Sequence, residues 1–193
     1  MNDPYLMLIF AKTIIMQRLA YLLSLSLLVF SFHCAAQEAN RPRPSPLAIA
    51  AIRYKDAYVK ITYSQPQKKG REIFGTLVPY GKVWRTGANE ATEITLTKDI
   101  TIGSILLRAG TYSLFTIPEK EKWTIIINSE VGLWGSYNYN SKLDVFRFDA
   151  PVHHIDKPLY EVFTVQIVQQ NNVADLLILW DDTKISIPIK FLN

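Results

Sequence analysis

The sequence has few of the residues that mark a catalytic or cross-linked protein. One of its 193 residues is cysteine and three are histidine, which excludes a disulfide scaffold. The formal net charge of +4 is too small to indicate a nucleic-acid partner by itself. No zinc-protease, nucleophile-elbow, phosphate-loop or calcium-loop motif is present. His153 and His154 are adjacent, so on a strand they point to opposite faces and make a poor shared metal site. We therefore expect no metal, no cofactor and no nucleic acid.

The first 36 residues have the features of a signal peptide. An uncharged run of 14 residues, 19–32 (LAYLLSLSLLVFSF), fits the apolar region of such a peptide and is short for a membrane span of about 20 residues. Arg18 supplies the positive charge before this run, and Ala36 ends a stretch of small residues typical of a cleavage site. We expect cleavage after Ala36 and an exported protein, periplasmic or extracellular.

Three details of this segment leave alternatives open. Met16 resembles a natural start, so residues 1–15 are a candidate misread upstream start. Cys34 makes lipoprotein anchoring a minor alternative, although the residues before it are not the small ones that lipidation favours. A single longer anchor over residues 5–36 is the other alternative, but Lys12 and Arg18 interrupt it with charges that are costly inside a bilayer. Cleavage would leave a mature chain with no stable membrane span.

Beyond the leader, the sequence predicts a tether followed by short strands. Residues 37–46 (QEANRPRPSP) hold three prolines and predict an extended tether. After them, apolar and polar residues alternate with period 2, most clearly at Ile185, Ile187, Ile189 and Phe191. The ten runs that we expect to be strands are 47–53, 59–64, 92–97, 101–107, 111–117, 122–128, 144–149, 160–169, 174–180 and 184–191.

These runs predict the fold class. Turn signals such as Lys55-Asp56, Gly103-Ser104 and Asp181-Asp182 separate apolar runs, and no segment after residue 36 shows a sustained helical period. About ten strands in one domain, residues 47–193, predict an all-β antiparallel sandwich or barrel. Pro188 has no N–H to donate to a ladder, which favours an edge position for the last strand.

The first irregular segment, residues 66–91, concentrates polar groups of distinct chemistry. It contains four of the eight glycines of the chain, and long irregular connections in compact domains are often functional. Guanidinium groups can fork around a carboxylate or phosphate, an amide can donate and accept, and an indole can form an apolar wall. The candidate ligand-binding residues here are Lys69, Arg71, Trp84, Arg85, Asn89 and Glu90. The same features also fit a loop that only covers the domain.

The second irregular segment, residues 129–143, is rich in aromatic residues. Trp134 and Tyr137 lie among glycines and asparagines. Aromatic faces beside amide groups are able to stack on a sugar and bond its hydroxyls. They are equally able to form a structural corner in which a tyrosine hydroxyl caps backbone groups. We include Trp134 and Tyr137 as candidate ligand-binding residues.

Four strings of the sequence resemble a known family. They are IFGTLVPYGKVWRTGANEATEI (73–94), AGTYSLFTIP (109–118), WTIIIN (123–128) and WGSYNY (134–139). They are similar to the bacterial domain-of-unknown-function family 2911 over roughly residues 44–191. The resemblance implies a secreted or envelope-associated single domain and carries over no catalytic residue, because no activity is established for the family. Its motif positions include Lys69, Gly70, Arg71, Tyr80, Gly81, Trp84, Arg85, Gly87, Ala88, Asn89, Glu90, Tyr112, Trp134 and Gly135.

Three functions remain in competition at this point. The first is binding of a small polar or anionic ligand, or a glycan, through residues 66–91 and 129–143. The second is an envelope or extracellular hydrolase in which Glu90 acts with Arg71 or Arg85. The third is a structural or interaction module without a small-molecule site. The sequence assigns no oligomeric state.

Overall fold

The computed structural model describes residues 4–35, 42–157 and 159–192. The chain divides into two compact units, which meet between Arg43 and Pro44. The first unit holds one helix, α1 (Pro4–Ala35), which includes the uncharged run at 19–32. Among the described residues, no helix is both long enough and apolar enough to cross a membrane. The expected cleavage site after Ala36 lies outside the described residues.

The second unit is built from eleven strands. All are antiparallel to their neighbours, as the alternating sequence predicts, and the strand count exceeds the expected ten because Gly103 and Ser104 turn the 101–107 run back on itself. The strands are β1 (Leu47–Tyr54), β2 (Ala57–Ser64), β3 (Thr92–Leu96), β4 (Ile100–Ile102), β5 (Ile105–Leu107), β6 (Gly110–Ile117), β7 (Lys122–Asn128), β8 (Asp144–His154), β9 (Tyr160–Gln170), β10 (Val173–Asp181) and β11 (Thr183–Phe191).

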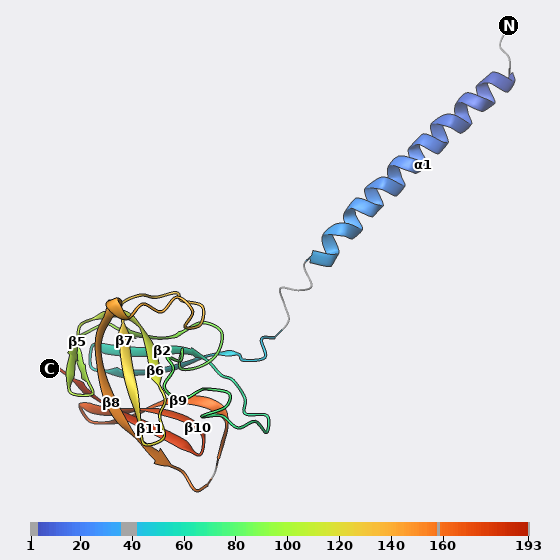
Figure 1. Cartoon of the computed structure of the whole chain (residues 1–193). Helices are drawn as coiled ribbons and strands as arrows, with labels where there is room; N and C mark the ends of the chain where they lie inside the picture. The colour runs from blue at the N-terminus through green and yellow to red at the C-terminus, as the bar shows by residue number, and fades with distance from the viewer. Residues whose placement is uncertain (1–3, 36–41, 158, 193) are drawn as a thin grey trace. The chain divides into compact units, whose positions relative to one another are not determined.

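The strands form one nearly closed, barrel-like sheet. Their order is β1-β2-β3-β6-β7-β8-β11-β10-β9, and the small β4–β5 hairpin pairs with β11. Beyond β2 the chain crosses to β9, where Gln67 pairs with Val162 and the N–H of Phe163 donates to the carbonyl of Pro66. Figure 1 shows the strands wrapped around a common interior. The expected sandwich or barrel is therefore confirmed in its barrel-like form.

Pro188 corrects one expectation, because β11 is not an edge strand. It lies between β10 on one side and β8 and β4 on the other. Strand β8 pairs with the start of β11, and β4 pairs with the end of β11 from Ile189 onward. Pro188 therefore lies in the gap between these two pairings. The carbonyl of Pro188 accepts from the Gly103 N–H on that side. Because the N and C=O of a strand residue face the same neighbour, the missing N–H also faces the gap.

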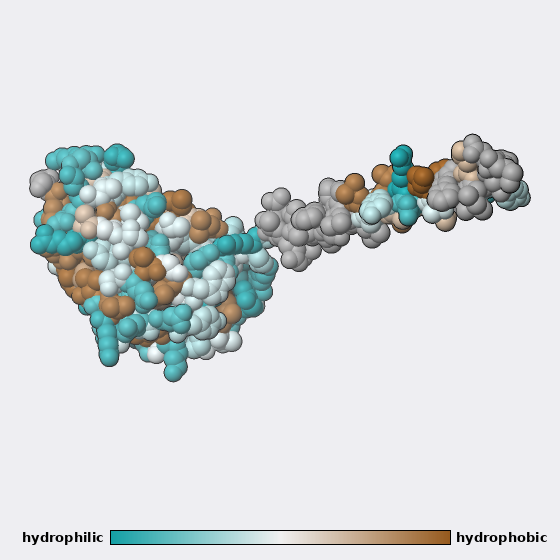
Figure 2. All heavy atoms as spheres, turned by 90° about the horizontal axis from the view of Figure 1, so that it is seen from above, coloured by the Kyte–Doolittle hydropathy of each residue, from teal (hydrophilic) through white to brown (hydrophobic). Residues whose placement is uncertain are grey.

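Alternation along the strands fills the interior as predicted. Ile185, Ile187, Ile189 and Phe191 are buried, and the residues between them point outward. The β2 residues at 57, 59, 61 and 63 repeat this pattern. On the outer face seen in Figure 2, brown hydrophobic patches are interspersed with teal hydrophilic ones. Burial of one face of each strand therefore holds the sheet together.

Tight turns join most of the strands, and two long irregular connections stand apart from them. Lys55-Asp56 and Asp181-Asp182 form two-residue turns, as expected. Residues 65–91 connect β2 to β3, and residues 129–143 connect β7 to β8, with a single turn of 3-10 helix at Ser141–Leu143. These connections match the two irregular segments that the sequence predicts.

Candidate functional site

The two irregular segments meet in a short antiparallel bridge. Glu90 pairs with Trp134. The N–H of Ala91 donates to the carbonyl of Leu133 at 2.9 Å, and the N–H of Gly135 donates to the carbonyl of Asn89, also at 2.9 Å. The 129–143 segment therefore fixes the position of the turn formed by residues 84–90, which we call the 84–90 turn.

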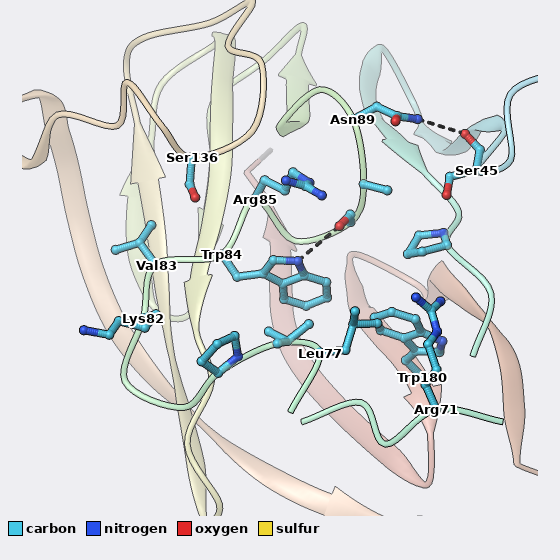
Figure 3. Close-up of a pocket in the computed structure, with 15 residues that line it drawn as sticks. Ser45, Arg71, Leu77, Lys82, Val83, Trp84, Arg85, Asn89, Ser136 and Trp180 are labelled. Atoms are coloured by element: carbon cyan, nitrogen blue, oxygen red, sulfur yellow. Dashed lines mark hydrogen bonds between the residues drawn. The ribbon is translucent and has the colours of Figure 1, made fainter. Parts of the chain in front are cut away.

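A cavity of about 440 Å³ opens beside the 84–90 turn (Figure 3). Three of its lining residues are cations, and no aspartate or glutamate is among the described residues that line it. The remaining lining residues are mostly apolar. The full lining is Ser45, Pro66, Arg71, Leu77, Val78, Pro79, Lys82, Val83, Trp84, Arg85, Gly87, Ala88, Asn89, Ser136 and Trp180. This volume lies in the range of small-molecule sites.

Aromatic side chains form the inner wall of the cavity. Trp84 and Trp180 both line it, and their rings stack at a centroid distance of 6.0 Å with 15° between the planes. Phe163 and Trp123 pack edge-on against Trp84. Trp84 is 9% exposed, and its Nε1–H donates to the carbonyl of Gly87 at 3.1 Å. The indole therefore anchors the turn, and the cavity rests on a rigid wall.

Arg85 brings a cation into the cavity with one donor unused. Its neighbour Trp84 exchanges two backbone hydrogen bonds with Thr116 of β6, which fixes where the Arg85 side chain begins. The side chain is partly buried, and its Nε is a buried donor without a hydrogen-bond partner in the described structure. In Figure 3 the guanidinium points into the open space of the cavity. An unsatisfied buried donor costs about 1–3 kcal/mol, and more when it is charged.

The 84–90 turn is also strained. Thr86 is 0% exposed and has a φ of 54°, which is a rare backbone conformation for a β-branched residue. Its hydroxyl donates to Thr116 at 3.1 Å, and its carbonyl accepts from the Thr92 hydroxyl at 2.6 Å. Gly87 follows with a φ of 155°, and a Cβ there would lie 3.0 Å from the Ser64 carbonyl oxygen. Such strain costs about 1–3 kcal/mol and is concentrated at functional sites.

The turn presents backbone donors as well as a side-chain donor. Gly87 and Ala88 are buried and line the cavity. Within the described part of the chain, neither backbone N–H donates to a protein acceptor. Backbone N–H groups without a protein acceptor are available to a ligand. Asn89 closes the far side, where its Nδ2 donates to the carbonyl of Ser45 at 3.1 Å.

Arg71 approaches the cavity from another segment. Its Nε donates to the carbonyl of Lys68 at 2.9 Å, and its Nη2 donates to the carbonyl of Gln67. Lys68 is itself held by an ion pair with Asp181 at 2.6 Å. The Arg71 guanidinium is therefore fixed to the part of the backbone that closes the barrel on β9. Lys82, the third cation of the lining, is exposed.

The structure brings together four of the eight predicted site residues. Arg71, Trp84, Arg85 and Asn89 line the cavity, whereas Lys69, Glu90, Trp134 and Tyr137 do not. Glu90 lines a separate cavity of about 280 Å³ together with Glu93. Trp134 and Tyr137 are 58% and 81% exposed. Lys69 is exposed, and its backbone N–H donates to the Glu161 carboxylate.

Sequence reasoning missed several residues of the site. Ser45 falls in the expected tether, but it lines the cavity, and the compact unit begins at Pro44. Trp180 belongs to an ordinary strand, β10, and carries no motif. Gly135 lies beside Arg85, since a Cβ there would be 3.5 Å from Nη1 of the guanidinium and 2.8 Å from the Tyr137 ring. Of these three residues, only Gly135 stood out in the sequence, as a glycine of the 129–143 segment.

A polar network holds the 129–143 segment against the barrel. The Tyr139 hydroxyl donates to the Asp144 carboxylate at 2.7 Å, and Arg147 Nε donates to the same carboxylate at 2.6 Å. Asn128 of β7 also donates to Asp144, at 2.8 Å. Partial burial and the hydrogen bond to Asp144 raise the pKa of Tyr139 from about 10 to about 12. These residues do not line the cavity, and their hydrogen bonds connect the 129–143 segment to β7 and β8.

No group in the described residues is arranged as a metal site. No cluster of three or more histidine, cysteine, aspartate or glutamate side chains occurs among them. His154 instead lies 3.1 Å from the Asp182 carboxylate, and His153 is exposed beside it on β8. The chemistry that the cavity offers is therefore recognition by guanidinium groups, backbone N–H groups and an apolar wall.

Comparison with known proteins identifies a family. The family model described as "Protein of unknown function (DUF2911)" matches residues 45–189. No curated protein and no solved structure matches the chain. The match confirms the resemblance seen in the sequence. It covers the 84–90 turn, the bridge to Trp134 and the strands up to Ile189 of β11. The chain therefore belongs to the DUF2911 family of proteins of unknown function.

Proposed function

We propose that this β domain binds a small anionic ligand, a carboxylate or a phosphate, in the cavity beside the 84–90 turn. The observation that carries the proposal is the buried Nε of Arg85, which has no hydrogen-bond partner in the described structure. A carboxylate or phosphate in the cavity would satisfy this donor with a charge-assisted hydrogen bond once the Arg85 side chain turns its Nε toward the ligand. The ligand would therefore supply the interaction that the protein leaves unmade.

The surroundings of Arg85 support an anion in preference to a neutral ligand. Arg71 and Lys82 line the same cavity, and no carboxylate among the described lining residues competes for them. The backbone N–H groups of Gly87 and Ala88 add neutral donors from the same turn. Trp84 and Trp180 exclude water from one side, which lowers the local dielectric and strengthens attraction between charges.

The geometry gives less support to the hydrolase alternative. In that alternative Glu90 acts on a substrate held by Arg71 or Arg85. Glu90 lines a different cavity, with Leu47, Glu93 and Gly132, and does not line the cavity of the two arginines. A general acid or base must reach the substrate within hydrogen-bonding distance. The arrangement therefore favours binding over catalysis by Glu90.

The proposal is tested by titrating the purified full chain with inorganic phosphate and acetate at low ionic strength, using calorimetry. We expect Arg85→Gln to weaken binding about 10- to 100-fold, because a hydrogen bond to a charged group contributes about 1.5–3 kcal/mol. Arg53→Gln is the matched control, since Arg53 is exposed on β1 and does not line the cavity. Unchanged anion affinity in a folded Arg85→Gln variant would contradict the proposal.

A sugar acid is a second candidate ligand. The Tyr137 ring lies against Gly135, which also adjoins the Arg85 guanidinium, so an exposed aromatic ring stands beside the proposed anion site. A uronic acid would place its carboxylate on Arg85 and its ring on Tyr137. We expect Tyr137→Ala to weaken glucuronate binding several-fold and to leave acetate binding unchanged. An equal effect on both anions would contradict the stacking role.

We also propose that the protein acts after export, with the leader removed. The support is the uncharged run at 19–32, followed by the small residues that end at Ala36. The domain boundary at Pro44 leaves the whole β unit intact after such a cleavage. Mass spectrometry of the protein from the producing cells is expected to find Gln37 at the N-terminus. Intact protein retained in the cytoplasm would contradict export.

A further inference from the structure

Two guanidinium groups reach the same cavity from separate parts of the backbone. Arg85 belongs to the 84–90 turn, which is fixed to β6 through Trp84 and Thr116. Arg71 belongs to the segment that follows β2, where its guanidinium is bonded to two backbone carbonyls. In Figure 3 the two side chains enter the cavity from different walls, with open space between them. These bonds fix each guanidinium to its own wall of the cavity.

A ligand with one anionic group would neutralise only one of the two guanidinium groups. The two guanidinium groups repel each other, and no carboxylate among the described lining residues neutralises them. The carbonyls of Lys68 and Gln67 occupy Nε and Nη2 of Arg71, which leaves its Nη1 for another acceptor. Arg85 brings its guanidinium to the same cavity. A ligand that bonds both guanidinium groups therefore needs two separate acceptor groups.

Apolar side chains form part of the lining of this cavity. Trp84 and Ala88 line it from the turn, and Leu77 and Pro66 line it from the connection that follows β2. An aliphatic spacer would bury apolar surface here, which contributes about 25 cal/mol per Å².

We infer that the ligand carries two anionic groups joined by a short aliphatic spacer, as in a dicarboxylate, with one group on Arg85 and the other on Arg71. This inference rests on the proposed anion site at Arg85 and adds Arg71 as the residue that selects for the second charge. Linking the two groups makes the second contact intramolecular, so a dianion of matching length gains affinity that neither end has alone.

The test is a length series measured by calorimetry on the full chain. Malonate, succinate, glutarate and adipate are compared with monocarboxylates of the same carbon number. We expect one length to bind at least ten-fold more tightly than its monocarboxylate, with weaker binding on either side of it. Arg71→Gln is expected to weaken binding of that dicarboxylate at least ten-fold and to weaken monocarboxylate binding much less, because a monocarboxylate keeps its contact with Arg85. Arg85→Gln is expected to weaken both.

The outcomes separate this inference from the proposed function. Dicarboxylates that bind no better than monocarboxylates would overturn the inference, even if Arg85→Gln still abolishes binding. The same holds if Arg71→Gln has no effect on the best dicarboxylate. Failure of every carboxylate and of phosphate to bind would overturn the proposed function as well. Arg71→Lys keeps the charge but loses the paired geometry, so an intermediate affinity is expected, and Arg53→Gln serves as the control for loss of a surface charge.

Discussion

Replacing Arg85 by methionine is expected to make the protein more stable and to abolish anion binding. Methionine keeps most of the length and apolar character of the side chain, and it removes the donor that has no partner at Nε. Such a donor costs about 1–3 kcal/mol when buried. Because the rest of the Arg85 side chain is only partly buried, we expect a gain near the lower end, about 1 kcal/mol.

The assay is reversible denaturation in urea, followed by tryptophan fluorescence. A gain of about 1 kcal/mol corresponds to about 2–4 °C in Tm for a domain of this size. Arg53→Met is the matched control, because Arg53 is exposed and surface substitutions usually change stability by less than about 0.5 kcal/mol. Phosphate at a hundred times its Kd should stabilise the natural protein by about 2.7 kcal/mol and the variant not at all.

A loss of stability in Arg85→Met would refute this reasoning. If the variant unfolds more easily by over 1 kcal/mol, the guanidinium holds the turn together, and Arg85 is part of a structural cover. If stability rises but phosphate still stabilises the variant, the anion binds elsewhere. The proposal agrees only with a gain in stability together with loss of the phosphate effect. In that case the Arg85 guanidinium lowers the stability of the free protein and is needed to bind the anion.

Three further predictions concern the support of the site, each measured by denaturation. Trp84→Ala should cost about 3–5 kcal/mol, because the buried indole packs against Trp180 and Phe163; a cost below 1 kcal/mol would contradict its anchoring role. Gly87→Ala should cost about 1–3 kcal/mol, because the Cβ would meet the Ser64 carbonyl at 3.0 Å; a neutral effect would show that the turn adjusts freely. The pKa of Tyr139 is raised to about 12 in the folded protein. The free energy of unfolding should therefore be unchanged by this group below pH 10 and should fall as the pH rises from 10 to 12, because Tyr139 loses its proton first in the unfolded state. Because Tyr139 is partly exposed to solvent, we expect this loss of stability to be at most about 1 kcal/mol. A Tyr139→Phe variant whose free energy of unfolding falls equally between pH 10 and 12 would contradict the assignment of the effect to Tyr139.

The strands were predictable from the sequence because burial imposes a period of 2 on them. The alternation at Ile185, Ile187 and Ile189 is a local property and needs no knowledge of neighbouring strands. The position of β11 in the sheet was not predictable in the same way. Pro188 excluded a hydrogen bond at one position, but only the pairing of β4 and β8 shows that the gap lies inside the sheet.

The candidate site was predictable in its segments and not in its contacts. Glycines and arginines marked residues 66–91, and aromatics marked residues 129–143. That Glu90 pairs with Trp134, and so faces away from the cavity of Arg85, depends on how two loops 44 residues apart are aligned. No sequence pattern marks Ser45 or Trp180 as a site residue, because each comes to line the cavity only when the barrel closes. Loop pairing of this kind is a tertiary property.

The distribution of energetic costs favours a binding site over a structural cover. A turn that served only to close one end of the barrel would be most stable with an apolar residue at position 85 and an unstrained backbone at 86. Instead, the buried unpartnered Nε of Arg85 and the positive φ of Thr86 occur at adjacent residues. Each costs stability, and the indole of Trp84 beside them holds both in place. Strong anchoring of an unfavourable conformation preorganises a site, because the ordering cost is met before the ligand arrives.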